Sequence, residues 1–261
     1  MPIEFANGEP AWVDLGSHDL QASKDFYHHL FDWEYQDLGA EAGQYHFILS
    51  GGKQVGGLGP IMEEGAGPAW TTYFQVADAE ATAAKVAETG GTVRFPPMDV
   101  MGQNVIAGFS DPAGGQFAVT QPKAHKGAEV WRENNAVCWV EYSGTEVREA
   151  LEFYHRLFGW SSRQAPEAPP GMEYLVQSVE GGNSDGLGGV MANPDHPAGA
   201  PPYWCVHFAT ADTDAVAAKA GDMGGTLMVP PMSIEGIGRM SVIADPQGAV
   251  FATLTPEPRA G

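Results

Sequence analysis

The chain carries an internal duplication, and this feature constrains its fold more than any other. The segment FYHHLFDW at positions 26–33 returns as FYHRLFGW at positions 153–160. Upstream of it, WVD at 12–14 returns as WVE at 139–141, and downstream DPAG at 111–114 matches DPQG at 245–248. Self-similarity at this spacing indicates repeated structural units. The sequence therefore predicts two homologous halves.

Each half divides again into two similar parts. Every part opens with a short apolar, β-branched run, continues with a helical periodicity and ends in further strand-like runs. Asp19 and Asp78 stand where helix N-caps belong, and Gly90-Gly91 stands where a helix ends. The predicted fold is α+β, with four βαβββ modules paired into two open barrel-like domains. Helices are expected at Leu20–Phe31, Ala79–Glu88, Glu146–Phe158 and Thr213–Met223.

The 261 residues suit two domains of this kind. We expect an N-terminal domain over 1–122, a polar linker over 123–132 and a C-terminal domain over 133–261. Each domain would contain two βαβββ modules. Because a duplicated fold buries one face of each sheet, a largely independent core is expected in each half.

Charge and composition limit the partners. Acidic residues number 33 against 13 basic ones, which gives a formal net charge of −20. Nucleic acids and anionic membranes are therefore not expected as partners, since phosphates are bound by Lys and Arg. No apolar run reaches the roughly 18 residues of a spanning helix, and no signal-peptide pattern opens the chain. Cys138 and Cys205 make no disulfide framework, so we expect a cytoplasmic monomer or homodimer with a small-molecule ligand.

The paired βαβββ pattern, the FYxxLFxW helix ending and the DPxG turn resemble the vicinal oxygen chelate superfamily. This group includes glyoxalases, bleomycin-resistance proteins and extradiol dioxygenases. The resemblance covers about residues 11–256 and is closest to the four-module, double-glyoxalase type. It implies a cleft in each pair of modules, and in the enzymatic members one divalent metal held by His, Glu or Gln. Relatives of this type also include drug-binding proteins encoded beside antibiotic biosynthesis genes.

The metal-ligand positions implied by the resemblance hold no metal-binding side chains. In the first half they fall on Trp12, Gly57 or Leu58, Thr72 and Ala118; in the second they fall on Trp139, Gly186 or Leu187, Val206 and Ala252. Three or four N, O or S donors are needed around such an ion. An offset of two residues would bring in Asp14 and Glu141, one carboxylate per cleft. We therefore predict no metal and no cofactor; a divalent metal belongs to the enzyme alternative below.

Aromatic residues are the candidate ligand-binding groups. Trp12 and Trp139 hold equivalent places on the two first strands. The other expected lining residues are Trp70, Thr72 and Phe74 in the first half, with Trp204, Val206 and Phe208 in the second. As cleft walls, the rings would stack on a flat ligand. Alternatively, they fill closed barrels as core side chains.

Asp14 and Glu141 are expected on inward strand faces. Each is a candidate general base or ligand anchor with a raised pKa, or a carboxylate bound by neighbouring donors. Among the histidines, His46 is the one that could enter a cleft, whereas His207 and both cysteines are expected to face the helices.

Two functions remain open at this stage. The first is metal-free binding of an aromatic or apolar metabolite or antibiotic, by one cleft or both. The second is a lyase, isomerase or dioxygenase that uses a divalent metal or acid–base chemistry at Asp14 or Glu141.

Overall fold

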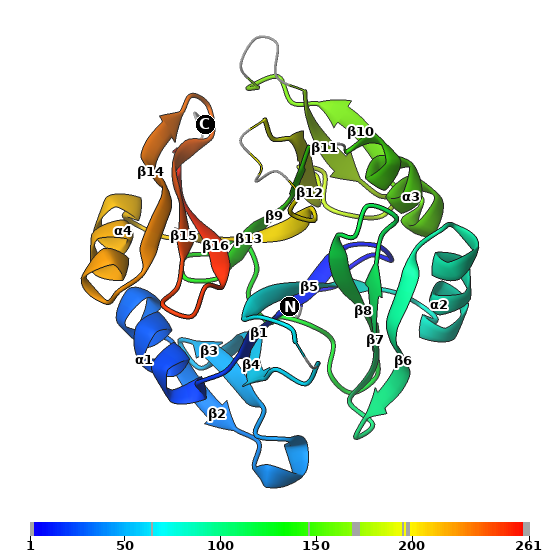
Figure 1. Cartoon of the computed structure of the whole chain (residues 1–261), viewed down its shortest axis with the longest axis horizontal. Coiled ribbons are helices and arrows are strands. Elements are labelled where there is room, and N and C mark those ends of the chain that lie inside the picture. Colours follow the sequence, from blue (N-terminus) through cyan, green and yellow to red (C-terminus); the bar gives the residue numbers. More distant parts are fainter. Residues whose placement is uncertain are drawn as a thin grey trace. The chain divides into compact units, whose positions relative to one another are not determined.

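The computed structural model describes residues 3–63, 65–145, 147–168, 173–194, 196 and 199–257. It contains two eight-stranded mixed sheets, and neither is closed into a barrel. The first sheet has the strand order β2-β3-β4-β1-β5-β8-β7-β6, and the second repeats this order as β10-β11-β12-β9-β13-β16-β15-β14. Figure 1 shows helices packed against the sheets. The predicted α+β fold of four βαβββ modules is confirmed.

The first half supplies the first sheet. Its first module consists of β1 (Pro10–Ser17), α1 (Leu20–Phe31), β2 (Glu34–Asp37), β3 (His46–Ser50) and β4 (Lys53–Pro60), with a short 3-10 turn at Ala40–Ala42. Its second module consists of β5 (Ala69–Gln75), α2 (Ala79–Glu88), β6 (Thr92–Val100), β7 (Asn104–Ser110) and β8 (Gln116–Pro122). In both modules the outer pairs are antiparallel, whereas β1 and β5 run parallel to β4 and β8.

The second half repeats these elements in the second sheet. Its first module consists of β9 (Val137–Gly144), α3 (Arg148–Phe158), β10 (Ser161–Gln164), β11 (Tyr174–Ser178) and β12 (Gly188–Ala192). Its second module consists of β13 (Tyr203–Ala209), α4 (Thr213–Asp222), β14 (Thr226–Ile234), β15 (Gly238–Ala244) and β16 (Val250–Pro256). The linker expected over 123–132 contains no helix or strand.

Three of the four α-helices in the described residues start at an aspartate cap. Asp19, Asp78 and Asp212 each accept a hydrogen bond from the backbone N–H three residues on, as the N-cap rule requires. The third helix starts at Arg148 and has no side-chain cap; the expected start at Glu146 lies outside the described residues. Among the described helices, none is long and apolar enough to cross a membrane.

The compact units of the chain combine modules from different halves. One unit comprises Val13–Trp70, Ala128–Trp139 and Cys205–Gly261, and we call it the α1–α4 unit. The other comprises Met1–Trp12, Thr71–Gly127 and Val140–Trp204, and we call it the α2–α3 unit. Each unit therefore takes the first module of one half and the second module of the other.

The duplicated motifs explain this exchange. In the α1–α4 unit, the hydroxyl of Tyr27, from the FYxxLFxW helix, donates to Asp245 Oδ2 at 3.1 Å and accepts from the Trp70 indole at 2.9 Å. Asp245 belongs to the DPxG turn of the opposite half, and its Oδ1 accepts from Gln247 N and Ala249 N. The helix motif of one half is thus hydrogen-bonded to the turn motif of the other.

The α2–α3 unit repeats this network with the halves exchanged. The hydroxyl of Tyr154 donates to Asp111 Oδ2 at 3.1 Å and accepts from the Trp204 indole at 2.9 Å. Asp111 Oδ1 accepts from the backbone N–H groups of Ala113 and Gly115. Both networks are buried, so their hydrogen bonds satisfy groups that water does not reach.

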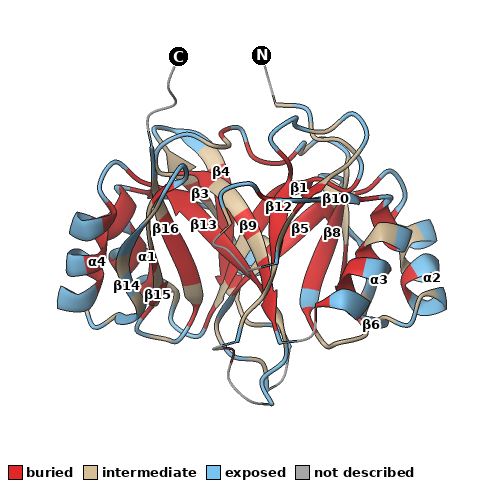
Figure 2. Cartoon of the chain, turned by 90° about the horizontal axis from the view of Figure 1, so that it is seen from above, coloured by how far each residue is buried: buried red, intermediate tan, exposed pale blue. Residues whose placement is uncertain are grey.

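The helices also pair across the halves. Lys85 on α2 donates to the carbonyl of Leu157 at the end of α3, and Lys219 on α4 donates to the carbonyl of His29 near the end of α1. A lysine near helix C-terminal carbonyls interacts favourably with the helix dipole. Figure 2 shows the helices buried on one side and exposed on the other. The expected independent core in each half is therefore wrong, because each core joins both halves.

Candidate functional site

A carboxylate and a tyrosine hydroxyl meet on the first sheet, on the face opposite its helices. We call this side of either sheet the helix-free face. Asp14 on β1 accepts a hydrogen bond of 2.5 Å from the hydroxyl of Tyr45, which directly precedes β3. Gly57 on β4 is the register partner of Asp14, and a Cβ there would lie 1.8 Å from the Tyr45 hydroxyl. The Tyr45 hydroxyl therefore occupies the space that a side chain at position 57 would fill, so this position must be glycine.

The second sheet repeats this arrangement. Glu141 on β9 is the register partner of Gly189 on β12, and the Tyr174 hydroxyl hydrogen-bonds the Glu141 carboxylate. A Cβ on Gly189 would lie 2.1 Å from that hydroxyl. Both carboxylates and both tyrosines are half-buried, so each pair keeps a side toward solvent. The duplication has thus built the same carboxylate–tyrosine–glycine site twice, once in each compact unit.

The environment of Glu141 changes its acidity. Burial raises the pKa of the Glu141 carboxyl above its ordinary value, and the hydrogen bond from Tyr174 opposes this rise. Desolvation disfavours the charged form of a carboxyl, which is the cause of the upward shift. A carboxyl of this kind exchanges a proton more readily near neutral pH than a solvated one does. Asp14 and Glu141 therefore remain the candidate proton-transfer or anchoring groups.

Two tryptophans precede these acids on the same strands. Strand alternation puts Trp12 on the face of Asp14, and Trp139 on the face of Glu141. Trp12 is 4% exposed and makes an edge-on contact with His125 at 4.6 Å between ring centroids. Trp139 is half-buried and has the guanidinium of Arg132 above its ring. Trp139 is therefore the more accessible of the two rings.

The other aromatic candidates of the first half point the other way. Trp70, Thr72 and Phe74 share one face of β5, and their exposed fractions are 6%, 0% and 0%. Trp70 packs against Tyr27, whereas Phe74 packs against Tyr154 on α3. These residues lie in the aromatic cores beneath the helices. The expectation that they line a cleft is wrong in this respect.

The same correction applies to the second half. Trp204, Val206 and Phe208 are 4%, 0% and 1% exposed; Trp204 packs on Tyr154 and Phe208 on Phe31. The error has one physical cause, because side chains alternate across a strand and a count displaced by one residue exchanges the faces. The helix-free face of these two strands holds the residues between the expected ones, which include Tyr73 and His207; both are buried.

Sequence reasoning missed the two tyrosines and their glycines. The signal was present, because QY at 44–45 and EY at 173–174 occupy matching places in the duplication. The pairing of Asp14 with Gly57 and of Glu141 with Gly189 depends on strand register, which the sequence alone did not define.

The histidines also differ from expectation. His46, named above as the histidine that could enter a cleft, is 6% exposed. Its Nδ1 lies 2.8 Å from the carbonyl oxygen of Gln44, and its register partner is the buried Leu58. His207, expected to face the helices, lies on the helix-free face and is also 6% exposed, with Ala252 as its register partner. Its Nε2 is buried without a hydrogen-bond partner among the described residues.

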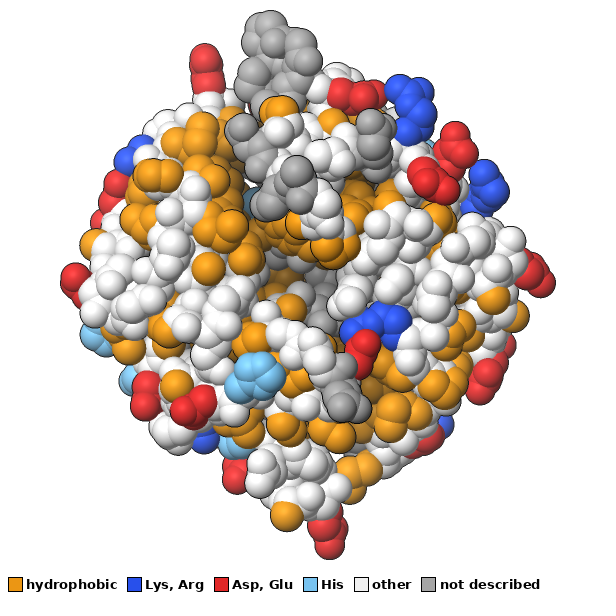
Figure 3. Space-filling model, in the orientation of Figure 1, with side chains coloured by type: hydrophobic (Ala, Val, Ile, Leu, Met, Phe, Trp, Pro, Cys, Tyr) orange, Lys and Arg blue, Asp and Glu red, His pale blue; other side chains and the backbone are white. Residues whose placement is uncertain are grey.

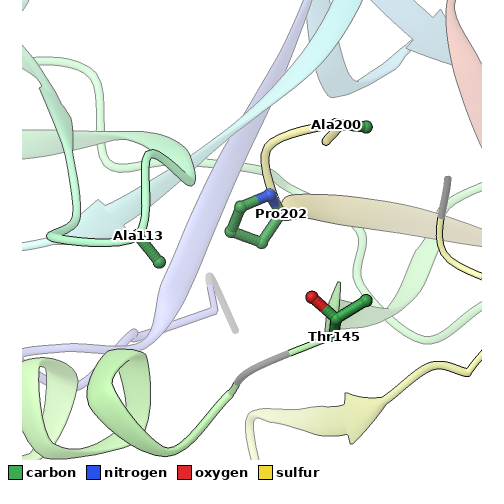
Figure 4. A pocket seen from close by; sticks show the side chains of 4 residues that line it. All are labelled: Ala113, Thr145, Ala200 and Pro202. Carbon is green, nitrogen blue, oxygen red and sulfur yellow. The ribbon is translucent and has the colours of Figure 1, made fainter. Parts of the chain in front are cut away.

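A small pocket lies elsewhere in the α2–α3 unit. It has a volume of about 170 Å³ and is lined by Ala113, Thr145, Ala200 and Pro202 (Figure 4). The Thr145 hydroxyl is the one polar side-chain group among these four. These described lining residues therefore offer no acid, base or metal ligand.

The donor groups on the helix-free faces do not fit a divalent metal. Such a site needs several converging donors, and carboxylate ligands must be ionised. Asp14 and Glu141 are each bound by a tyrosine, and burial favours the protonated form of Glu141. In the part of the chain that the structure describes, no group of three His, Cys, Asp or Glu residues could hold an ion. The prediction that the chain uses no metal stays a prediction.

The buried imidazole of His207 makes stability depend on pH. Burial lowers the pKa of His207 from 6.5 to about 4. The unfolded chain therefore binds this proton first, and the free energy of unfolding should fall as the pH drops from about 6.5 to about 4. The loss attributable to His207 is about 3 kcal/mol by linkage. Urea denaturation at several pH values measures it, and a His207→Gln variant should lack this part of the pH dependence. If the free energy of unfolding depended on pH equally in both proteins, the prediction would be contradicted.

Comparison with known proteins places the chain in a family. The model of the Glyoxalase/Bleomycin resistance protein/Dioxygenase superfamily matches residues 10–119 and 137–253. The chain belongs to this superfamily, whose members bind small-molecule substrates. The match occurs twice, once over each half, in agreement with the duplication.

Individual relatives agree with this assignment. A Mycobacterium tuberculosis protein named "Putative glyoxylase CFP32" is 35% identical, with 98% of each chain covered. The anthracycline biosynthesis protein DnrV of Streptomyces peucetius is also 35% identical, with 96% of this chain and 94% of that protein covered. Among solved structures, the Mn(II)-bound glyoxalase of Novosphingobium aromaticivorans matches with a TM-score of 0.65 at 16% identity, covering 95% of this chain and 82% of that one. This last likeness concerns the fold alone.

Proposed function

We propose that the chain is a small-molecule binding protein that holds a flat, hydroxylated aromatic ligand without a metal. The observation that carries the proposal is the carboxylate–tyrosine pair built twice, Asp14 with Tyr45 and Glu141 with Tyr174, each across a glycine. Neither set of donors suits a metal, yet both pairs retain a solvent-facing side.

The chemistry of the pairs indicates the kind of ligand. A carboxylate oxygen accepts a hydrogen bond from a ligand hydroxyl, and the tyrosine hydroxyl, once the ligand hydroxyl has replaced it on the carboxylate, can donate to a ligand carbonyl. A hydroxyquinone presents such a hydroxyl and carbonyl side by side. The relatives named as anthracycline biosynthesis proteins support a ligand of this type.

Titration with a neutral dihydroxyanthraquinone tests the proposal. Saturable quenching of tryptophan fluorescence is expected. Gly57→Ala and Gly189→Ala each insert a Cβ where the tyrosine hydroxyl lies, so the phenol must move away from its carboxylate. Each variant should weaken binding at its own site by roughly tenfold, about 1.4 kcal/mol.

Gly67→Ala is the matched control, because a Cβ there meets no atom within 4 Å. It should bind as the unaltered protein does. A neutral probe keeps the chain's net charge of −20 from producing non-specific attraction. Absence of saturable binding, or unchanged affinity in both glycine variants with the fold intact, would reject the proposal.

Acid–base catalysis without a metal is the second candidate, and the raised pKa of Glu141 favours it. A general base next to a bound carbonyl compound would exchange an α-proton with solvent. NMR in D₂O with α-tetralone, a flat ketone, would show deuterium entering the carbon beside its carbonyl. Glu141→Gln should abolish this exchange while the ketone still binds. Exchange that persists in Glu141→Gln, or none in the unaltered protein, would argue against catalysis by this group.

A further inference from the structure

The pocket of the α2–α3 unit has a filled counterpart in the α1–α4 unit. The two DPxG turns place Gln247 in one unit and Ala113, which lines the pocket, in the other. The Gln247 carboxamide bridges its turn to the end of β1, because its oxygen accepts from His18 N at 3.1 Å and from Asp19 N at 3.0 Å. Ala113 ends at its methyl group, so the corresponding space is left open.

The other residues of the pocket support this correspondence. Thr145 directly follows β9 as His18 directly follows β1, at the repeat spacing of the first modules. The loop before β13 adds Ala200 and Pro202 to the lining (Figure 4). A cavity of about 170 Å³ thus lies where the other unit holds a side chain. Its size suits a ligand of about six or seven heavy atoms, because an engineered cavity of about 150 Å³ binds benzene.

The hydrogen-bond acceptors around the two spaces differ. In the α1–α4 unit, the nitrogen of the Gln247 carboxamide donates to the hydroxyls of Ser17 and Ser23, at 3.1 and 2.7 Å. Gly144 and Ala150 stand at the equivalent positions of the α2–α3 unit, and neither has a hydroxyl. A ligand N–H group would therefore find fewer acceptors here than the Gln247 amide does, and an unpaired N–H group shielded from water is costly.

Thr145 supplies the pocket with a hydrogen-bond donor. Figure 4 shows its hydroxyl directed toward the space between Ala113 and Pro202. No hydrogen bond joins this hydroxyl to another residue in the part of the chain that the structure describes. It can therefore donate to a ligand carbonyl oxygen. The side chains of Ala113, Ala200 and Pro202 are apolar and suit the alkyl part of such a ligand.

Charge favours a neutral ligand over an anionic one. The chain has 33 acidic and 13 basic residues, and Figure 3 shows carboxylates scattered over the displayed face with few basic side chains between them. Glu149 adds a carboxylate to the first turn of α3, the helix that follows Thr145. An overall negative field repels anions, and the four described lining residues include no cation. A carboxylate is therefore a poorer ligand here than a neutral carbonyl compound.

We infer that this pocket binds a small neutral carbonyl compound, a ketone or an ester of the size of cyclohexanone. The carbonyl oxygen accepts from the Thr145 hydroxyl, and the alkyl part contacts Ala113, Ala200 and Pro202. The ligand takes the place that the Gln247 side chain fills in the other unit, with carbon in place of the amide nitrogen. The pocket is lined by residues other than the carboxylate–tyrosine pairs, so the inference goes beyond the proposed function and does not depend on it.

The test compares three probes of matched ring size on the full chain. They are cyclohexanone, δ-valerolactam, which has an N–H beside its carbonyl, and methylenecyclohexane, which has CH₂ in place of the oxygen. Dissociation constants come from two-dimensional ¹H–¹⁵N NMR titrations. Cyclohexanone should bind more tightly than both other probes, by about fivefold for one net hydrogen bond. Thr145→Val should weaken cyclohexanone binding by about fivefold and change methylenecyclohexane binding by less than about twofold.

Ala113→Gln should fill the pocket and weaken cyclohexanone binding by roughly tenfold or more. The variant gives this turn the DPQG sequence that already forms the turn of the other unit. Ala124→Gln, the same substitution at an exposed alanine, is the matched control and should leave the affinity unchanged. No saturable binding of cyclohexanone, equal affinity in Ala113→Gln and Ala124→Gln, lactam binding as tight as ketone binding, or an equal loss of ketone and hydrocarbon in Thr145→Val would overturn the inference.

Discussion

Separate fragments 1–127 and 128–261 are expected not to fold as native monomers, and to recover the native fold when they are mixed. The cut falls where the chain passes from one compact unit to the other. In fragment 1–127, Tyr27 loses Asp245 and Phe31 loses Phe208. Each large core truncation costs about 3–5 kcal/mol, and a domain's whole stability is about 5–15 kcal/mol.

Circular dichroism and size-exclusion chromatography of the fragments, alone and mixed, measure this result. An equimolar mixture should elute as one complex with the spectrum of the intact chain. Self-association of one fragment is also compatible, because each half contains both the FYxxLFxW helix and the DPxG turn. A fragment that folds cooperatively as a monomer would show that the interlocked cores are dispensable.

Asp111→Ala should destabilise the protein by about 3–5 kcal/mol, which is the range of severe core substitutions. The carboxylate accepts from the Tyr154 hydroxyl and from the backbone N–H groups of Ala113 and Gly115. Its removal leaves the buried Tyr154 hydroxyl and Gly115 N–H unpaired, at about 1–3 kcal/mol for each group that water cannot reach. The measurement is urea denaturation at pH 7.

A double-mutant cycle distinguishes loss of the Tyr154–Asp111 hydrogen bond from general damage to the DPxG turn. Tyr154→Phe removes the hydroxyl, and its effect should overlap with that of Asp111→Ala, since both remove one shared hydrogen bond. Asp245→Ala, in the other unit, should cost a similar amount and couple with Tyr27→Phe, not with Tyr154→Phe. Coupling of Asp111 with Tyr27 instead would contradict the exchange of modules between the halves.

Much of the fold followed from the sequence because its signals are local. The aspartate caps at Asp19 and Asp78 marked two helices, and the observed starts agree. The duplicated WVD and WVE segments identified equivalent first strands, and the acids they contain, Asp14 and Glu141, face away from the helices. Periodicity and capping depend on neighbours within a few residues, so a single sequence displays them.

The strand faces of the candidate residues were predicted in part. Asp14, Glu141 and Trp139 lie on helix-free faces, whereas Trp70, Phe74, Trp204 and Phe208 lie in the cores. The predicted facing of the side chains on β5 and β13 is wrong because it is displaced by one residue along each strand. Strand faces alternate with a period of two, so such a displacement exchanges every side chain.

The sequence by itself determined the module order, the helices and the presence of two equivalent acids. Tertiary structure alone decided that Tyr45 and Tyr174 bind those acids, that the register makes Gly57 and Gly189 obligatory, and that each core combines modules from both halves. The physical reason is the range of the interactions involved. Tyr27 and Asp245 lie 218 positions apart, and the same duplicated motif could pair within its own half or with the other. A repeat pattern cannot distinguish these two pairings, because both halves carry the same complementary residues.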